Sequence, residues 1–76
     1  MANAEKILAR MRNNPRDWRI EDLKVLAARF GIAYWQHGTS HAGFRLPSGR
    51  KIIVPVAKPI KEVYVKQFLA LLVDSE

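Results

Sequence analysis

The chain lacks cysteine, so it can form neither a disulfide framework nor a cysteine-based zinc site. Acidic residues are few, and the stretch 31–61 contains no Asp or Glu at all. A magnesium or calcium site would need carboxylates in that stretch. A Ser-His-Asp triad would need one to orient its histidine. Two histidines without acidic or thiol neighbours also make a poor zinc site. The sequence therefore predicts no metal and no other cofactor.

Long apolar runs are missing as well. The N-terminal segment has no apolar stretch of signal-peptide length, and nothing approaches the length that spans a membrane. With the lack of cysteine, this favours a reducing, cytoplasmic setting, and we expect no membrane partner. The 76 residues predict a single domain, 1–76, with a small core.

Positive charge is what the chain has in excess. Thirteen Lys and Arg stand against seven Asp and Glu, which gives a net charge of +6 and a pI of about 10.2. This balance favours an anionic partner, first a nucleic acid and second an acidic protein. The plainer interpretation is a domain whose basic faces are simply solvated.

Apolar residues at helical spacing predict two N-terminal helices, over residues 4–12 and 20–30. Gly31 ends the second one, and Trp18 in the connector is expected to fill a gap in the core. The apolar stripes of the two helices consist of Ile7, Leu8 and Met11, and of Ile20, Leu23, Leu26, Ala27 and Phe30. The first stripe is expected to join the core, and a second interpretation makes it a patch that a protein partner covers.

Three short strands are predicted next, over residues 32–36, 42–46 and 51–55. The turn Pro47-Ser48-Gly49 joins the last two. Pro55 cannot donate a ladder hydrogen bond, so the third strand ends there or lies at an edge. Tyr34 and Trp35 are neighbours in the first strand, so only one of them can face the core.

A last helix is predicted over residues 59–73, with Pro59 in its first turn. Its expected buried face consists of Ile60, Val63, Tyr64, Phe68, Leu71 and Leu72. The result is an α+β fold in which helices cover one face of a three-stranded antiparallel sheet. From residue 20 onward, the order helix–strand–strand–strand–helix is that of double-stranded-RNA-binding domains.

The segment 38–45 contains the main candidates for a functional site. Alternation along the second strand should turn Ala42, Phe44 and Leu46 toward the core. His41 and Arg45 should then lie side by side on an open, cationic face. A titratable imidazole next to a fixed cation suits RNA cleavage through the 2′-hydroxyl. The alternative role for His41 is to fasten the hairpin by hydrogen bonds.

An ordered set of motifs resembles the HicA toxin family of bacterial toxin–antitoxin modules. The set begins with Gly38-Thr39-Ser40-His41 and continues through Phe44-Arg45-Leu46-Pro47-Ser48-Gly49-Arg50-Lys51. It ends with Ile52-Ile53-Val54-Pro55, Pro59-Ile60-Lys61 and the helix from Tyr64 to Leu69. The resemblance covers about residues 20–73.

The resemblance implies a double-stranded-RNA-binding-like core over residues 19–76, with residues 1–18 as an added helical extension. It also implies metal-independent cleavage of mRNA, with His41 as the family's histidine and Ser40 and Gly38 as its motif neighbours. The partner would be a HicB-type antitoxin, which masks the active surface. The chain departs from the family at Thr39, which lengthens the turn, and at Val56, where many members carry a histidine.

Several basic residues are candidates for phosphate contact. Arg45 is the nearest cation on the face of His41, and the neighbouring strand offers Arg50 or Lys51. The remaining two candidates are Lys58 and Lys61, which flank the start of the predicted last helix or are simply solvated. His37 is a candidate general acid or a plain surface residue.

These observations predict an mRNA-cleaving endoribonuclease with His41 as general base. A non-catalytic RNA-binding module of the same fold would share the basic surface without needing the histidine. A protein-interaction domain with no role in RNA binding is the third interpretation.

Overall fold

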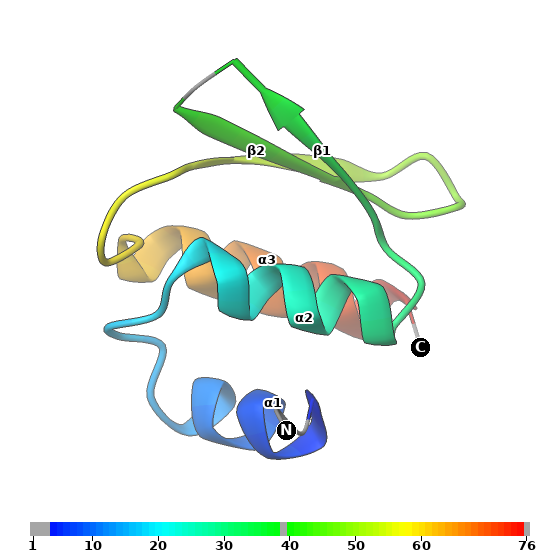
Figure 1. The fold of residues 1–76 in the computed structure, drawn as a ribbon. Coiled ribbons are helices and arrows are strands. Elements are labelled where there is room, and N and C mark those ends of the chain that lie inside the picture. Colours follow the sequence, from blue (N-terminus) through cyan, green and yellow to red (C-terminus); the bar gives the residue numbers. More distant parts are fainter. Residues whose placement is uncertain (1–3, 39, 76) are drawn as a thin grey trace.

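The computed structural model describes residues 4–38 and 40–75, apart from the side chains of His37 and Ser75. The described residues form three helices and three strands. In chain order they are α1 (Ala4–Asn13), α2 (Ile20–Arg29), β1 (Ala33–His37), β2 (His41–Arg45), β3 (Lys51–Pro55) and α3 (Glu62–Ser75). The sheet forms the top layer in Figure 1, with α2 and α3 beneath it and α1 farthest from the sheet. The predicted α+β class, with helices on one side of the sheet, is therefore confirmed.

The three strands form an antiparallel sheet in the order β1-β2-β3, so β2 is the central strand. Alternation directs Phe44 toward the helices, where its ring centroid lies 4.9 Å from that of Phe68 in an edge-on contact. Tyr34, opposite Phe44 in register, lies on the same side, with its ring centroid 5.4 Å from that of Phe44. Ala42, Phe44 and Leu46 are all buried, as the alternation predicted.

The last helix begins later than the sequence predicted. It starts at Glu62 rather than Pro59. The Lys61 carbonyl, just before the first turn, accepts the Tyr64 N–H at 3.0 Å. The prediction that Val63 is buried is wrong, since Val63 is 53% exposed. Val65 is buried instead, and two residues rotate a side chain by about 200° around a helix.

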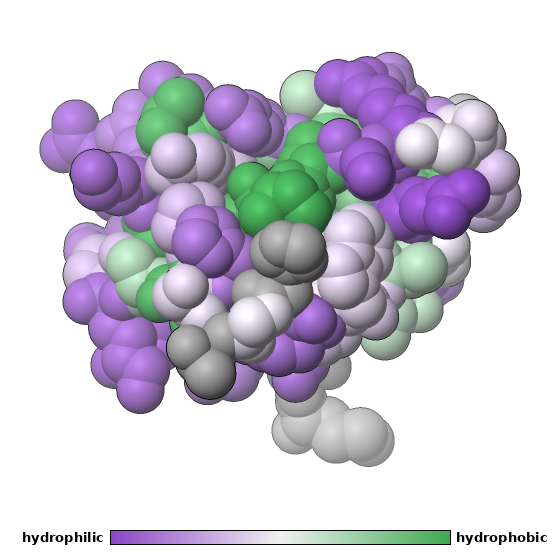
Figure 2. All heavy atoms as spheres, turned by 90° about the horizontal axis from the view of Figure 1, so that it is seen from above, coloured by the Kyte–Doolittle hydropathy of each residue, from purple (hydrophilic) through white to green (hydrophobic). Residues whose placement is uncertain are grey.

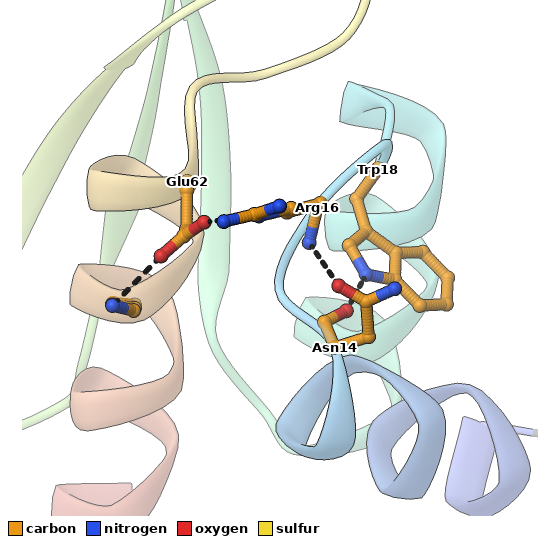
Figure 3. A network of polar contacts seen from close by, with 5 residues as sticks. Asn14, Arg16, Trp18 and Glu62 are labelled. Carbon is orange, nitrogen blue, oxygen red and sulfur yellow. Dashed lines mark hydrogen bonds and ion pairs between the residues drawn. The ribbon is translucent and has the colours of Figure 1, made fainter.

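The N-terminal helix packs on α2 through the buried side chains of Leu8 and Met11. Both residues therefore belong to the core. Trp18, in the connector between α1 and α2, packs partly against that core as predicted. Its indole N–H donates to the carbonyl of Asn14 at 2.6 Å (Figure 3). The connector is thus anchored to α1 as well as to the core.

A polar clasp, formed by Arg16, Glu62 and Lys66, joins this connector to α3. The two oxygens of Glu62 accept from Arg16 Nε and Lys66 Nζ, each at 2.8 Å (Figure 3). The hydrogen bond from Lys66, followed by that from Arg16, lowers the pKa of Glu62. The hydrogen bond to Glu62 raises the pKa of Arg16. Nearby, the Ile60 N–H donates to the Trp18 carbonyl at 2.8 Å, so backbone also ties the two segments.

Within residues 4–38 and 40–75, none of the helices combines the length and the apolar character needed to cross a membrane.

Candidate nucleic-acid interface on the open sheet face

The side of the sheet that faces away from the helices is called here the open face. Register and alternation define it by three rows of residues that run across the strands. The rows are Ala33, Arg45 and Lys51; Trp35, Gly43 and Ile53; and His41 with Pro55. Figure 2 looks down on this side of the molecule and shows apolar surface near its middle, with hydrophilic groups to both sides.

His41 is the first residue of β2 and is half-buried. Its Nδ1 lies 3.0 Å from the hydroxyl oxygen of Ser40. The carbonyl of Ser40 accepts the Val56 N–H at 2.7 Å, which ties this corner to the segment that follows β3. Ser40 therefore contacts the imidazole and is itself held by its backbone.

The turn before Ser40 is braced from β1. Gln36 accepts the Tyr34 hydroxyl at 2.7 Å and donates through Nε2 to the carbonyl of Gly38 at 2.9 Å. Gly38 has φ +70°, which glycine adopts without steric cost. His37 is the backbone register partner of His41. Its side chain and all of Thr39 lie outside the described residues, so the role of His37 as general acid stays a prediction.

Arg45 and Lys51 occupy the opposite end of the open face. They are direct register partners, and both are exposed. Like charges opposite each other on one face destabilise a sheet. A bound anion would offset that repulsion, so the pair is a candidate phosphate contact.

The prediction that His41 and Arg45 lie side by side is wrong. Both residues belong to the open face, but they stand at the two ends of β2. Four steps along the strand separate their Cα atoms by about 13 Å. Alternation identifies the shared face, and the rise per residue sets the distance along it.

The middle of the open face is occupied by Trp35, which sequence reasoning had left undecided against Tyr34. Trp35 is opposite Gly43 in register. A Cβ placed on Gly43 would lie 2.2 Å from Cε2 and Cζ2 of the indole and 2.6 Å from Cδ2. The absence of a side chain on Gly43 therefore allows the ring to lie against the strand. The outward position of Gly43 was predictable, but pairing it with Trp35 required the hairpin register.

Arg50 lies in the turn before β3 and is ion-paired with Asp74 of α3. That contact connects the β2–β3 turn to the end of α3. It gives Arg50 a carboxylate partner in the helix layer, whereas Lys51, one residue later, belongs to the open face.

Lys58 and Lys61 lie in the segment that leaves the sheet at the His41 end. β3 ends at Pro55, the register partner of His41, and the chain then descends to α3 (Figure 1). Both lysines are exposed. Glu62 already occupies the first turn of α3 and is paired with two cations there. Of the predicted phosphate contacts, Lys58 follows Pro55, the strand partner of His41, most closely in the sequence.

The charge of the open face differs from that of the helix layer. The acidic side chains that the structure describes are all on helices or on the α1–α2 connector. Across residues 4–38 and 40–75, no group of three His, Cys, Asp or Glu residues lies close enough together to hold a metal ion. A sheet face with cations and without a described carboxylate is suited to an anionic chain.

Comparisons of the chain with protein-family models, with curated proteins and with solved structures find no match. The resemblance to HicA toxins therefore depends on the motifs in residues 20–73. The residues of the open face and their geometry are the basis for proposing a function.

Proposed function

We propose that the protein is a metal-independent endoribonuclease of the HicA type that cleaves mRNA and thereby inhibits translation. The observation that carries the proposal is the contact between Ser40 and His41 at one end of a cationic sheet face. A histidine oriented by a hydroxyl neighbour can act as a general base. The motif resemblance supports the same role for the same residue.

His41 accepts the proton of a ribose 2′-hydroxyl in the proposed reaction. The 2′-oxygen then forms a bond to phosphorus while the bond from phosphorus to the 5′-oxygen breaks. The products are a 2′,3′-cyclic phosphate and a 5′-hydroxyl, whose proton comes from water or from a general acid. If Nδ1 carries its proton and donates to Ser40, Nε2 is the nitrogen that acts as base.

The candidate cations would divide into two groups. Arg45 stands about 13 Å from His41 along β2, and Lys51 is its partner on β3, so the pair would hold a different phosphate of the same RNA strand. Lys58 follows Pro55, the strand partner of His41, and is the candidate for charge stabilisation near the reacting phosphate. Substrate positioning and chemistry would therefore use different residues.

The proposed regulator is an acidic, HicB-type antitoxin in the bacterial cytoplasm. The net charge of +6 favours such a partner. The described carboxylates lie away from the open face, so none of them would repel an acidic protein bound there. Inhibition would then be competitive, because antitoxin and RNA would need the same cations.

A non-catalytic RNA-binding module is the second candidate. Two observations favour it: the contact with Ser40 is also what a hairpin-fastening histidine makes, and the cationic pair is remote from His41. The fold and the basic surface would be the same in both cases.

The test is incubation of the purified chain with a long single-stranded RNA in EDTA, beside His41→Ala and His41→Gln. Arg29→Ala is the matched control, because Arg29 lies on α2 and pairs with Glu5 of α1. We expect cyclic-phosphate fragments from the parent and the control. Loss of the general base should slow cleavage by roughly 10²- to 10⁴-fold in both histidine variants.

Equal cleavage by His41→Ala and parent would rule out His41 as the base. Intact RNA from a folded parent that still binds RNA would establish the binding module instead. Circular dichroism of each variant separates loss of chemistry from loss of fold.

A further inference from the structure

The indole of Trp35 lies with its face against the backbone of Gly43. The three indole atoms nearest to a Cβ built on Gly43 are adjacent ring atoms, and their distances from it are 2.2, 2.2 and 2.6 Å. Distances this similar place that carbon above the ring rather than beyond its edge. One side of the aromatic ring therefore contacts the strand, and the other side is directed away from the sheet.

Trp35 has an apolar neighbour on the open face. Ile53 belongs to the same row, on the edge strand β3, and its side chain is 37% exposed. Trp35 itself is half-buried, because one ring face is covered by Gly43. Figure 2 shows apolar surface near the middle of this side of the molecule.

Charge lies one row from the ring. Arg45 and Lys51 are two residues along their strands from Gly43 and Ile53, a spacing of about 7 Å. The row on the other side of Trp35 contains His41. An aromatic ring with cations to one side is the combination by which proteins bind single-stranded nucleic acids, with bases on the ring and phosphates on the cations.

We infer that Trp35 stacks on one unpaired base of single-stranded RNA, while Arg45 and Lys51 hold a phosphate of the same strand. This inference rests on the proposed function for its RNA substrate, and it adds the strandedness of that RNA and the residue that binds a base. The bound strand crosses the open face from the Arg45–Lys51 pair, over Trp35, to His41. The nucleobase stacked on Trp35 thus lies between the phosphate bound by Arg45 and Lys51 and the proposed catalytic residue, His41.

A double helix does not fit this arrangement. Its bases stack on each other, and their faces are not accessible to a side chain, so a protein recognises it through its backbone and grooves. An aromatic ring in the middle of the binding face gains contact only with a base that is already unstacked. The open face therefore selects single strands over duplexes despite the αβββα order of the core.

The test measures binding without cleavage, using a 2′-O-methyl oligonucleotide of about 12 residues, as a single strand and as a duplex. We expect tryptophan fluorescence to be quenched by the single strand and much less by the duplex. Trp35→Ala should weaken binding of the single strand by roughly 5- to 150-fold, which corresponds to about 1–3 kcal/mol for loss of one stacked base. Trp35→Phe should retain most of the affinity.

Trp18→Phe is the matched control, because Trp18 lies in the α1–α2 connector and donates to Asn14. This variant should bind like the parent and keep the quenching, which then comes from Trp35 alone. The quenching experiment needs no substitution at Trp35, so it decides the matter even if Trp35→Ala folds poorly.

Equal binding of single strand and duplex, unaltered affinity in Trp35→Ala, or absence of quenching in Trp18→Phe would each overturn the inference. The cleavage assay separates its failure from failure of the proposed function. His41→Ala should still bind and quench. If RNA quenches the fluorescence of the parent but the parent does not cleave it, base stacking on Trp35 is supported and the proposed ribonuclease activity is wrong.

Discussion

The inner and outer faces of the sheet use alternate residues of the same strands. In β2, Ala42 and Phe44 face the helices and are fully buried, whereas His41, Gly43 and Arg45 face outward. The inner face is filled by apolar side chains that contact one another. Much of the outer face consists of a like-charge pair, a glycine and a histidine, which do not favour strand formation. Stability is thus concentrated on one face, and the other is left to hold residues suited to a ligand.

The largest effect on stability should come from Phe44→Ala. The Phe44 ring is completely buried and contacts the rings of Tyr34 and Phe68. Its removal should lower the free energy of unfolding by about 3–5 kcal/mol, because both burial and packing are lost. Urea denaturation monitored by circular dichroism measures this change.

The neighbouring residue supplies the control. Arg45→Ala removes an exposed side chain of the open face and should change the free energy of unfolding by less than about 0.5 kcal/mol. A similar loss in both variants would mean that the two faces contribute alike and that the contrast is wrong.

Gly43→Ala should have an intermediate effect. The added methyl group would overlap the Trp35 ring, and overpacking of this kind costs about 1–3 kcal/mol. The same substitution should cost much less in a Trp35→Ala background, since the ring is then gone. A double-mutant cycle in urea measures the coupling, and a coupling near zero would show that the ring does not rest on Gly43.

Lys51→Glu should have a small effect on stability, and its sign is opposite. The new carboxylate would face Arg45 directly, so a repulsive cross-strand pair becomes attractive, worth about 0.2–1 kcal/mol of added stability. Binding of the single-stranded oligonucleotide should weaken at the same time, because a cation is replaced by an anion. Thermal melts and titrations at one salt concentration measure the two effects. Reduced stability together with unchanged binding would contradict the division between the faces.

Local sequence patterns predicted the hairpins and the two N-terminal helices well. Alternation in residues 42–46 identified the buried positions, and Gly31 follows the end of α2 closely. The start of α3 was placed too early because Pro59 suits a first turn by local preference. Tertiary contacts outweigh that preference: Ile60 donates to Trp18, and Glu62 is held by Arg16. These partners are more than forty residues apart, where no local pattern connects them.

The candidate site was predictable in composition and less so in geometry. Strand alternation assigned His41 and Arg45 to one face, but their separation depends on the rise per residue, which the prediction neglected. Whether Tyr34 or Trp35 faces outward depends on the pairing of β1 with β2. The ion pair between Arg50 and Asp74 joins the β2–β3 turn to α3 and has no signature in either segment.

The layered arrangement has a practical consequence for handling the protein. The start of α1 and the end of α3 both lie on the helix side of the sheet (Figure 1). A fusion partner or an affinity tag joined beyond either helix would extend from that side. The chain can therefore be immobilised through either end with its open face presented to solution, which is the orientation that a biosensor surface requires.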